Sequence, residues 1–110
     1  MNAPFSYAIW VTKPGCEDDF VARWRDLAHW TTETLKPKGW ARLLQDKAQP
    51  NRFVSLGPWE SFEAIEAWRA HPGFKERISR LHELLESFAP ATLESRVEIG
   101  VDEAKKQRVA

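Results

Sequence analysis

The order of strand-like and helix-like segments limits the folds open to this chain more than any other feature of its sequence. Strands are recognised by apolar residues at every second position, and helices by apolar residues three or four positions apart. The predicted segments are a strand at Phe5–Thr12, a helix at Cys16–Leu35, strands at Trp40–Asp46 and Arg52–Gly57, a helix from Phe62 to about Ala70, a further helical segment at about Phe74–Phe88, and a strand at Leu93–Gly100. Residues 5–100 therefore follow a strand–helix–strand–strand–helix–strand order.

Turn and capping residues support this division. Lys13-Pro14-Gly15 is a turn signal that follows the first strand. Residues 17–19 are all acidic, which suits the positive end of a helix dipole at the start of the first helix. Ser61 is predicted to cap the helix that begins at Phe62. Pro90 is expected to end the last helical segment, because proline lacks a backbone N–H.

This β-α-β-β-α-β order is typical of an α+β, ferredoxin-like fold with a four-stranded antiparallel sheet. The helices of such a fold cover only one face of the sheet, so the other face needs a different cover. Trp10, Ala41 and Leu43 are predicted to make this second face apolar. We therefore expect a homodimer, because a second copy of the chain is the simplest cover.

Length and composition indicate one domain and exclude several classes of protein. The 110 residues fit a single domain, 1–110, with a core at about 5–100 and a polar tail at 101–110. Lys plus Arg and Asp plus Glu number 16 each, so no basic excess favours a nucleic-acid partner. No apolar run predicts a membrane span, and the N-terminus has no signal-peptide pattern. Cys16 is the only cysteine, which is typical of a cytoplasmic protein.

One stretch of the sequence resembles a known family. The run from Phe53 to Trp68 reads FVSLGPWESFEAIEAW, a strand followed by an aromatic–acidic–serine helix start, and His71-Pro72-Gly73-Phe74 opens the next helical segment. Together with the element order, this run resembles the antibiotic biosynthesis monooxygenase (ABM) family over roughly residues 7–100. The resemblance implies a dimeric α+β barrel in which two sheets face each other. It also implies oxidation of a small apolar or hydroxylated aromatic substrate by molecular oxygen, without a metal or flavin.

Three polar residues are candidates for catalysis. Tyr7, the only tyrosine, lies on a predicted central strand, where its hydroxyl needs either a structural partner or a substrate. Arg42 lies in an otherwise apolar row and is a candidate for stabilising an anion, with a salt bridge to Glu94 or Glu98 as the alternative. His71 lies at the break between helices and is either a general base or a helix cap.

The residues predicted to contact the substrate are apolar, and they are Ile9, Trp59, Trp68 and Phe74. Trp68 is alternatively a ring of the core, and Trp59 a staple that holds its helix to the sheet. The three histidines of the chain lack the spacing of metal ligands. We therefore predict neither a metal site nor a cofactor.

Other functions remain open from the sequence. One alternative is a dimer that binds an apolar small molecule without turning it over, and another is a dimer whose aromatic side chains fill the pocket. A third is membership of the haem-degrading branch that resembles this chain at Trp68. In that branch an iron-ligating histidine is expected at Ile78 and an asparagine near Tyr7-Ala8-Ile9, so two of three functional positions differ.

Overall fold

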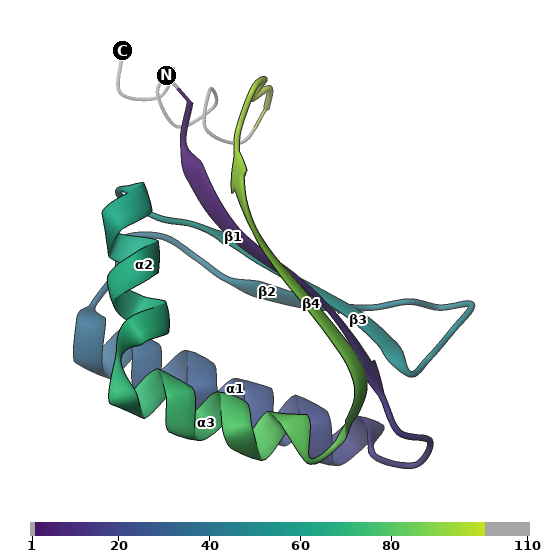
Figure 1. Cartoon of the computed structure of the whole chain (residues 1–110). Coiled ribbons are helices and arrows are strands. Elements are labelled where there is room, and N and C mark those ends of the chain that lie inside the picture. The colour runs from purple at the N-terminus through teal and green to yellow at the C-terminus, as the bar shows by residue number, and fades with distance from the viewer. Residues whose placement is uncertain (1, 101–110) are drawn as a thin grey trace.

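The computed structural model describes residues 2–100, which contain four strands and three helices. The elements are β1 (Pro4–Thr12), α1 (Glu17–Leu35), β2 (Arg42–Gln45), β3 (Arg52–Pro58), α2 (Phe62–Ala70), α3 (Pro72–His82) and β4 (Leu85–Glu94) (Figure 1). The polar tail predicted at 101–110 lies outside the described residues. Within residues 2–100, no helix combines the length and the hydropathy that crossing a bilayer requires.

The strands form one antiparallel sheet in the order β2-β3-β1-β4. All three helices lie on the same side of this sheet (Figure 1). The second crossover consists of two helices, because His71 is extended and Pro72 begins α3. Proline suits the first position of a helix, where a backbone N–H would have no acceptor within the helix. The predicted α+β, ferredoxin-like fold is confirmed, with the order β-α-β-β-α-α-β.

Stacked aromatic rings join α1 to the two central strands. Trp10 on β1, Phe20 on α1 and Phe53 on β3 are each at most 3% exposed. The Phe20 ring centroid lies 5.3 Å from that of Trp10 and 4.8 Å from that of Phe53. Full burial of a large apolar side chain contributes about 1.5–3 kcal/mol to stability. This cluster therefore fixes the position of α1 on the sheet.

The uncovered face of the sheet carries different residues from those predicted. Trp10 and Leu43 pack into the core beneath the helices, and Ala41 lines a cavity on that same side. Successive side chains of a strand point to opposite faces of the sheet, so the rows of residues between the helix-facing ones point away from the helices. These rows carry Phe5, Tyr7, Ile9, Val11, Leu44, Val54 and Leu56. The bare face is therefore apolar as expected, but the three residues assigned to it were wrong.

The last helix ends, and the last strand begins, earlier than predicted. Helix α3 ends at His82, and residues 95–100, which form most of the predicted strand, have no regular structure. The helical spacing of apolar residues does continue to Phe88, but a short apolar run does not distinguish helix from strand. Phe88 instead pairs with Trp10 across the β1–β4 ladder. Pro90 does not end a helix, because it lies in β4, an edge strand that tolerates proline.

Strand β2 is shorter than predicted, because the chain leaves the ladder before Arg42. The carbonyl oxygen of Trp40 lies 2.5 Å from the point where a Cβ on Gly57 would stand. Only glycine leaves room for this close backbone approach. The residues around Trp40 therefore cross the helix-facing side of β3 rather than pairing with it.

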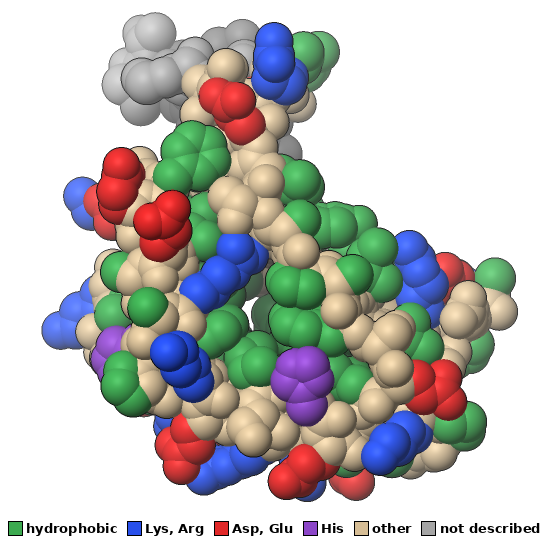
Figure 2. All heavy atoms as spheres, in the orientation of Figure 1, with side chains coloured by type: hydrophobic (Ala, Val, Ile, Leu, Met, Phe, Trp, Pro, Cys, Tyr) green, Lys and Arg blue, Asp and Glu red, His purple; other side chains and the backbone are tan. Residues whose placement is uncertain are grey.

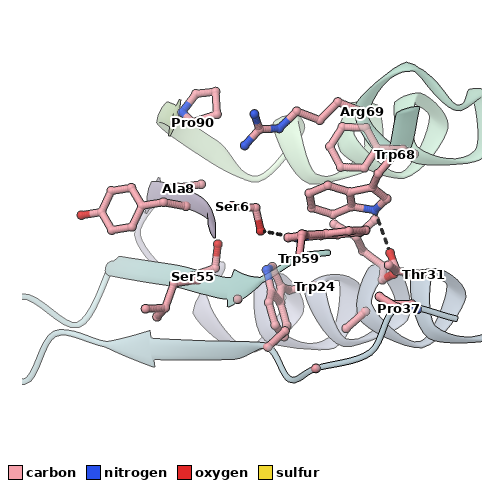
Figure 3. A pocket seen from close by; sticks show the side chains of 18 of the residues that line it. Ser6, Ala8, Trp24, Thr31, Pro37, Ser55, Trp59, Trp68, Arg69 and Pro90 are labelled. Carbon is pink, nitrogen blue, oxygen red and sulfur yellow. Dashed lines mark hydrogen bonds between the residues drawn. The ribbon is translucent and has the colours of Figure 1, made fainter. Parts of the chain in front are cut away.

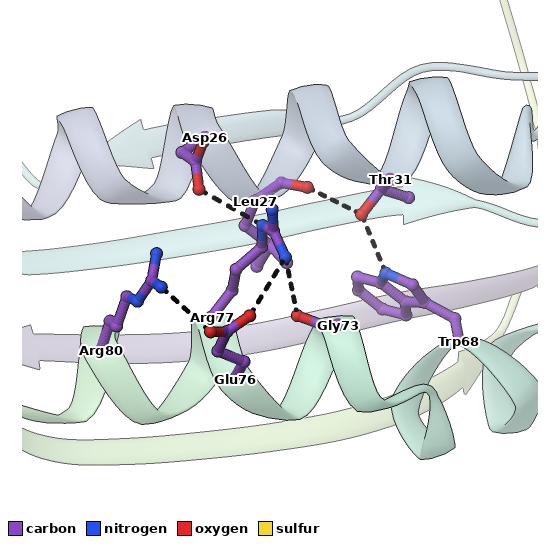
Figure 4. Close-up of polar contacts among 8 residues, drawn as sticks. All are labelled: Asp26, Leu27, Thr31, Trp68, Gly73, Glu76, Arg77 and Arg80. Carbon is purple, nitrogen blue, oxygen red and sulfur yellow. Dashed lines mark hydrogen bonds and ion pairs between the residues drawn. The ribbon is translucent and has the colours of Figure 1, made fainter.

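Arg77 ties α3 to α1 (Figure 4). Its guanidinium forms an ion pair with Asp26 on α1 at 3.3 Å and donates to the Gly73 carbonyl at 3.2 Å. It also lies 4.9 Å from the centroid of the Trp30 ring, close enough for a cation–π interaction. This contact between the helices fixes one side of the space beneath them.

Candidate functional site

A cavity of about 320 Å³ lies between the sheet and the helices. This volume falls within the range of small-molecule sites in proteins. Figure 2 shows a hollow between the helical layer and the sheet, bordered mainly by hydrophobic side chains with a basic side chain beside it. The many aromatic rings of the chain therefore leave this space open rather than filling it.

The floor of the cavity is open because the sheet carries small residues there. Ser6 and Ala8 on β1 and Ser55 and Gly57 on β3 occupy neighbouring positions of the helix-facing rows (Figure 3). Further along the same strands, large aromatic rings fill the corresponding space. The change from large to small side chains along the sheet thus sets where the cavity begins.

Aromatic rings form the walls of the cavity. The ring centroids of Trp59 and Trp68 lie 4.8 Å apart, and those of Trp68 and Phe74 lie 4.6 Å apart. Aromatic pairs at these distances stack offset or edge to face, which presents both ring faces and ring edges to a ligand. The walls are therefore suited to a flat apolar molecule.

Three indole N–H groups around the cavity donate to hydroxyl groups of the protein. The pairs are Trp59 to Ser6 at 3.0 Å, Trp10 to Ser55 at 3.0 Å and Trp68 to Thr31 at 2.9 Å. A buried indole usually requires such a partner, and the bond fixes the orientation of its ring. These three N–H groups are therefore committed to the protein and not to a ligand.

Arg69 on α2 is the only Lys, Arg, Asp or Glu among the described residues that line the cavity. Its guanidinium donates to the Thr92 hydroxyl at 2.6 Å and to the Ala91 carbonyl at 2.8 Å, both on β4. It forms no ion pair within residues 2–100. Burial lowers the pKa of Arg69, but arginine stays protonated at neutral pH. A cation held only by neutral groups in an apolar site is suited to binding an anion.

Three of the four residues predicted to contact the substrate, Trp59, Trp68 and Phe74, line the cavity. Ile9 does not, because it belongs to the row of β1 that points to the bare face. Tyr7 lies in the same row as Ile9. Its backbone, rather than its hydroxyl, therefore borders the cavity.

Arg42, the candidate for stabilising an anion, lies outside the lining of the cavity. It pairs in register with Leu56, whose row faces away from the helices, and its side chain is exposed. Its guanidinium lies 5.4 Å from the centroid of the Trp40 ring. No ion pair joins Arg42 to Glu94 or Glu98 within the described part of the chain.

His71 lies outside the lining of the cavity and caps α3. Its Nδ1 accepts a hydrogen bond from the Gly73 backbone N–H at 2.9 Å. The imidazole meets the Trp30 ring edge to face, with centroids 5.0 Å apart. Of the two roles predicted for this histidine, the structure shows the cap.

The sequence also matches the family that its motifs resemble. The model of the family described as antibiotic biosynthesis monooxygenase matches residues 8–80, well over half of the chain. This chain belongs to the ABM family. No curated protein matches this ABM chain significantly.

Solved structures share the fold of this ABM protein. The oxygenase SnoaB from Streptomyces nogalater, described as cofactor-independent, is 19% identical with a TM-score of 0.73, over 91% of this chain and 98% of that one. A conserved protein from Methanosarcina mazei Go1 is 23% identical with a TM-score of 0.71, over 89% and 95%. A protein from Shewanella oneidensis is 20% identical with a TM-score of 0.70, over 86% and 91%. At these identities the similarity establishes the fold alone.

This ABM chain differs from the haem-degrading branch at the position expected to ligate iron. Ile78 stands where that branch is expected to carry its iron-ligating histidine, and it lines the cavity with a side chain that has no ligand atom. Within residues 2–100, no group of three or more His, Cys, Asp or Glu is arranged to hold a metal ion.

Sequence reasoning missed Arg69 and the serines of the cavity floor. Arg69 follows Ile65 by four residues, and Ile65 is fully buried, so both lie on the face of α2 that turns inward. Ser6 and Ser55 lie in strand rows that also carry buried aromatic residues. A polar residue in an otherwise buried row was the available signal in each case.

Proposed function

We propose that this ABM protein is a cofactor-independent monooxygenase that oxidises a small apolar or hydroxylated aromatic substrate in the cavity. The observation that carries the proposal is an apolar cavity of about 320 Å³ in which Arg69 is the only charged residue of the described lining. Such a site holds a flat ring and one negative charge. Membership of the ABM family supports the class of reaction.

The proposed reaction proceeds through an anion of the substrate. Loss of a proton from a phenol or an activated C–H gives a phenolate or enolate, which donates electrons to molecular oxygen. One oxygen atom enters the product, and the substrate gives up two hydrogens, which leave with the second oxygen atom as water. Arg69 stabilises the negative charge, and it does so more strongly than in water because the surrounding walls are apolar.

A second candidate function is binding without turnover. No Asp or Glu lines the cavity among the described residues, and His29, which is exposed, is the only histidine that does. The interior therefore lacks an obvious general base. A substrate that ionises readily by itself removes this need, whereas a substrate that does not is bound and left unchanged.

Oxygen uptake distinguishes the two candidates. The assay measures oxygen consumption with a panel of hydroquinones and anthrones in the presence of a metal chelator, and mass spectrometry follows ¹⁸O₂ into the product. Monooxygenation places one labelled atom in each product molecule. Binding of the same compounds with no oxygen uptake from any of them supports the binding function and contradicts the enzyme.

The catalytic roles of Tyr7, Arg42 and His71 remain predictions of the sequence. The same assay tests them with Tyr7→Phe, Arg42→Ala and His71→Ala. If all three variants keep the full rate, these three residues are not catalytic.

We also propose that the protein is a homodimer in which the bare faces of two sheets pack together. The support is the row of apolar side chains on that face, where Leu44 is 50% and Leu93 44% exposed in the single chain. A contiguous apolar surface of this kind usually marks an interface. Two such faces in contact would form the barrel that the family resemblance implies.

The cytoplasmic location is a proposal that rests on Cys16. It is a free thiol, and it is the only cysteine of the chain. Free thiols persist in reducing compartments. Cell fractionation that recovers the protein outside the cytoplasm would contradict the proposal.

A further inference from the structure

Two serine hydroxyls on the floor of the cavity carry a hydrogen that no group of the described chain accepts. A serine hydroxyl donates one hydrogen bond and has two acceptor lone pairs. Ser6 and Ser55 each accept from an indole N–H at 3.0 Å, and neither donates to any group within residues 2–100. Thr31 differs, because it accepts from Trp68 and also donates to the Leu27 carbonyl at 2.8 Å. The two serines thus keep an unused donor, and the threonine does not.

Both serines face the same space. Ser55 is 9% exposed, Ser6 is half-buried, and both are among the side chains that line the cavity (Figure 3). In the β1–β3 register Ser55 pairs with Ala8, two residues from Ser6. The serines are therefore diagonal neighbours, about 7–8 Å apart. One bound ring system can meet both hydroxyls.

The indole contacts also direct the hydroxyl hydrogens. An indole N–H that points at a serine oxygen repels a hydroxyl hydrogen on the same side, so the O–H bond turns away from the ring. This holds for Ser55 beside Trp10 and for Ser6 beside Trp59. A buried hydroxyl without an acceptor is unfavourable, and an acceptor on a ligand relieves that penalty.

We propose that Ser6 and Ser55 determine substrate specificity by donating hydrogen bonds to a carbonyl or phenolate oxygen of a bound aromatic molecule. This inference rests on the proposed function, because it takes the cavity as the substrate site. The accepting oxygen faces the sheet, while Arg69, at the α2–β4 side, holds the negative charge of the same molecule. The floor of the cavity therefore selects oxygenated aromatic molecules over hydrocarbons of the same shape and fixes which edge of the ring faces the helices.

The test compares two stable ligands that differ by one carbonyl oxygen, 1-tetralone and tetralin, by titration calorimetry. The native protein is expected to bind 1-tetralone about 3- to 10-fold more tightly than tetralin, the effect of one net hydrogen bond. In the double variant Ser6→Ala/Ser55→Ala this preference falls to about 1-fold. The matched control is Ser87→Ala, a serine that pairs with Val11 and points to the bare face, and it keeps the native preference.

The two affinities of the native protein can be compared without any variant. This test therefore remains valid even if Ser55→Ala unfolds because the Trp10 N–H loses its partner. Ser6→Ala alone gives a second test at a half-buried position, with partial loss of the preference expected. Equal affinities in the native protein overturn the inference. Full preference in a folded double variant also overturns it, because Arg69 or a bound water then provides the donor.

Binding of tetralone does not depend on turnover, so the two proposals fail separately. A preference for the ketone without oxygen uptake from any phenol contradicts the monooxygenase and supports the serine specificity. Oxygen uptake without a preference for the ketone supports the monooxygenase and contradicts the role of the serines.

Discussion

Arg69 carries the charge of the candidate site, and its contacts leave it free to take an anionic partner. Both of its acceptors within residues 2–100, the Thr92 hydroxyl and the Ala91 carbonyl, are neutral. Arg69→Gln keeps a donor and removes the charge. Because hydrogen bonds to charged groups contribute about 1.5–3 kcal/mol, kcat/KM for a phenolic substrate is expected to fall roughly 10- to 100-fold.

The matched control is Arg25→Gln, an exposed arginine of α1 outside the cavity lining, which is expected to leave kcat/KM unchanged. Oxygen uptake measures both variants, and thermal unfolding checks that Arg69→Gln stays folded. Native kcat/KM in a folded Arg69→Gln protein would show that another group stabilises the anion.

Gly73 is required by the Trp30 ring that lies against it. A Cβ at this position would overlap ring atoms of Trp30, and neither backbone can move without disturbing the contact between α1 and α3. Alanine normally favours a helix over glycine, but here overpacking is expected to dominate and destabilise by about 1–3 kcal/mol.

Urea unfolding measures the free energy of unfolding of Gly73→Ala. The control is Lys75→Ala at an exposed position of α3, which is expected to stay within about 0.5 kcal/mol of the native chain. A Gly73→Ala protein as stable as the Lys75→Ala protein would mean that Trp30 moves aside without penalty.

For single residues, the sequence predicted the aromatic residues of the cavity better than its charged residue. Trp59, Trp68 and Phe74 were predicted to meet a ligand, and all three line the cavity. Arg42 was chosen because its neighbours are apolar, but those neighbours lie on the bare face. Which of two apolar rows faces the helices depends on packing between distant segments, and the sequence does not encode that locally.

Among the elements, the β2–β3 hairpin contains a carboxylate with a perturbed pKa. Asp46 accepts hydrogen bonds from the backbone N–H groups of Ala48 at 2.8 Å and Gln49 at 3.1 Å, and it pairs with Arg52 at 3.4 Å. The bond from Ala48, followed by that from Gln49, lowers the pKa of Asp46 below its usual value. The ionised carboxylate therefore stabilises the folded hairpin.

Because this pKa is lower in the folded chain, the stabilisation is present above the unfolded value of about 3.9 and is lost as pH falls through the folded value. Asp46→Asn is expected to be less stable than the native chain at neutral pH, and the difference should shrink at an acidic pH below the unfolded pKa. Urea unfolding at both pH values measures the difference. A difference that stays constant with pH would rule out the charge as its source.

The elements themselves were predicted well up to α3 and poorly after it. The Ser61 cap is confirmed, since its side chain accepts from the Ala64 N–H at 3.0 Å. The boundary between α3 and β4 was missed because Phe88 continues the helical spacing by chance and because Leu93–Gly100 alternates like a strand. In the fold, the edge of β1 that does not pair with β3 forms its ladder with Leu85–Glu94.

For the whole molecule, the apolar bare face predicts a specific oligomer. The native chain is expected to sediment as a dimer at micromolar concentration. Val54→Lys places a charge on β3 in the middle of that face and is expected to give a monomer, because an unpaired lysine in an apolar interface is unfavourable.

The matched control is Ala22→Lys on an exposed position of α1, which is expected to leave the dimer intact. A native chain that sediments as a monomer contradicts the paired-sheet barrel, whatever the variants do.

Five of the six tryptophans line the cavity, and Trp30 lies apart between α1 and α3. Indole emission changes with local polarity and is quenched by many aromatic and carbonyl compounds. The unlabelled protein therefore reports optically on whatever enters its interior, with Trp30 as a constant background. Compound libraries can be screened by intrinsic fluorescence, and stopped-flow mixing can time the entry and exit of a ligand without any turnover.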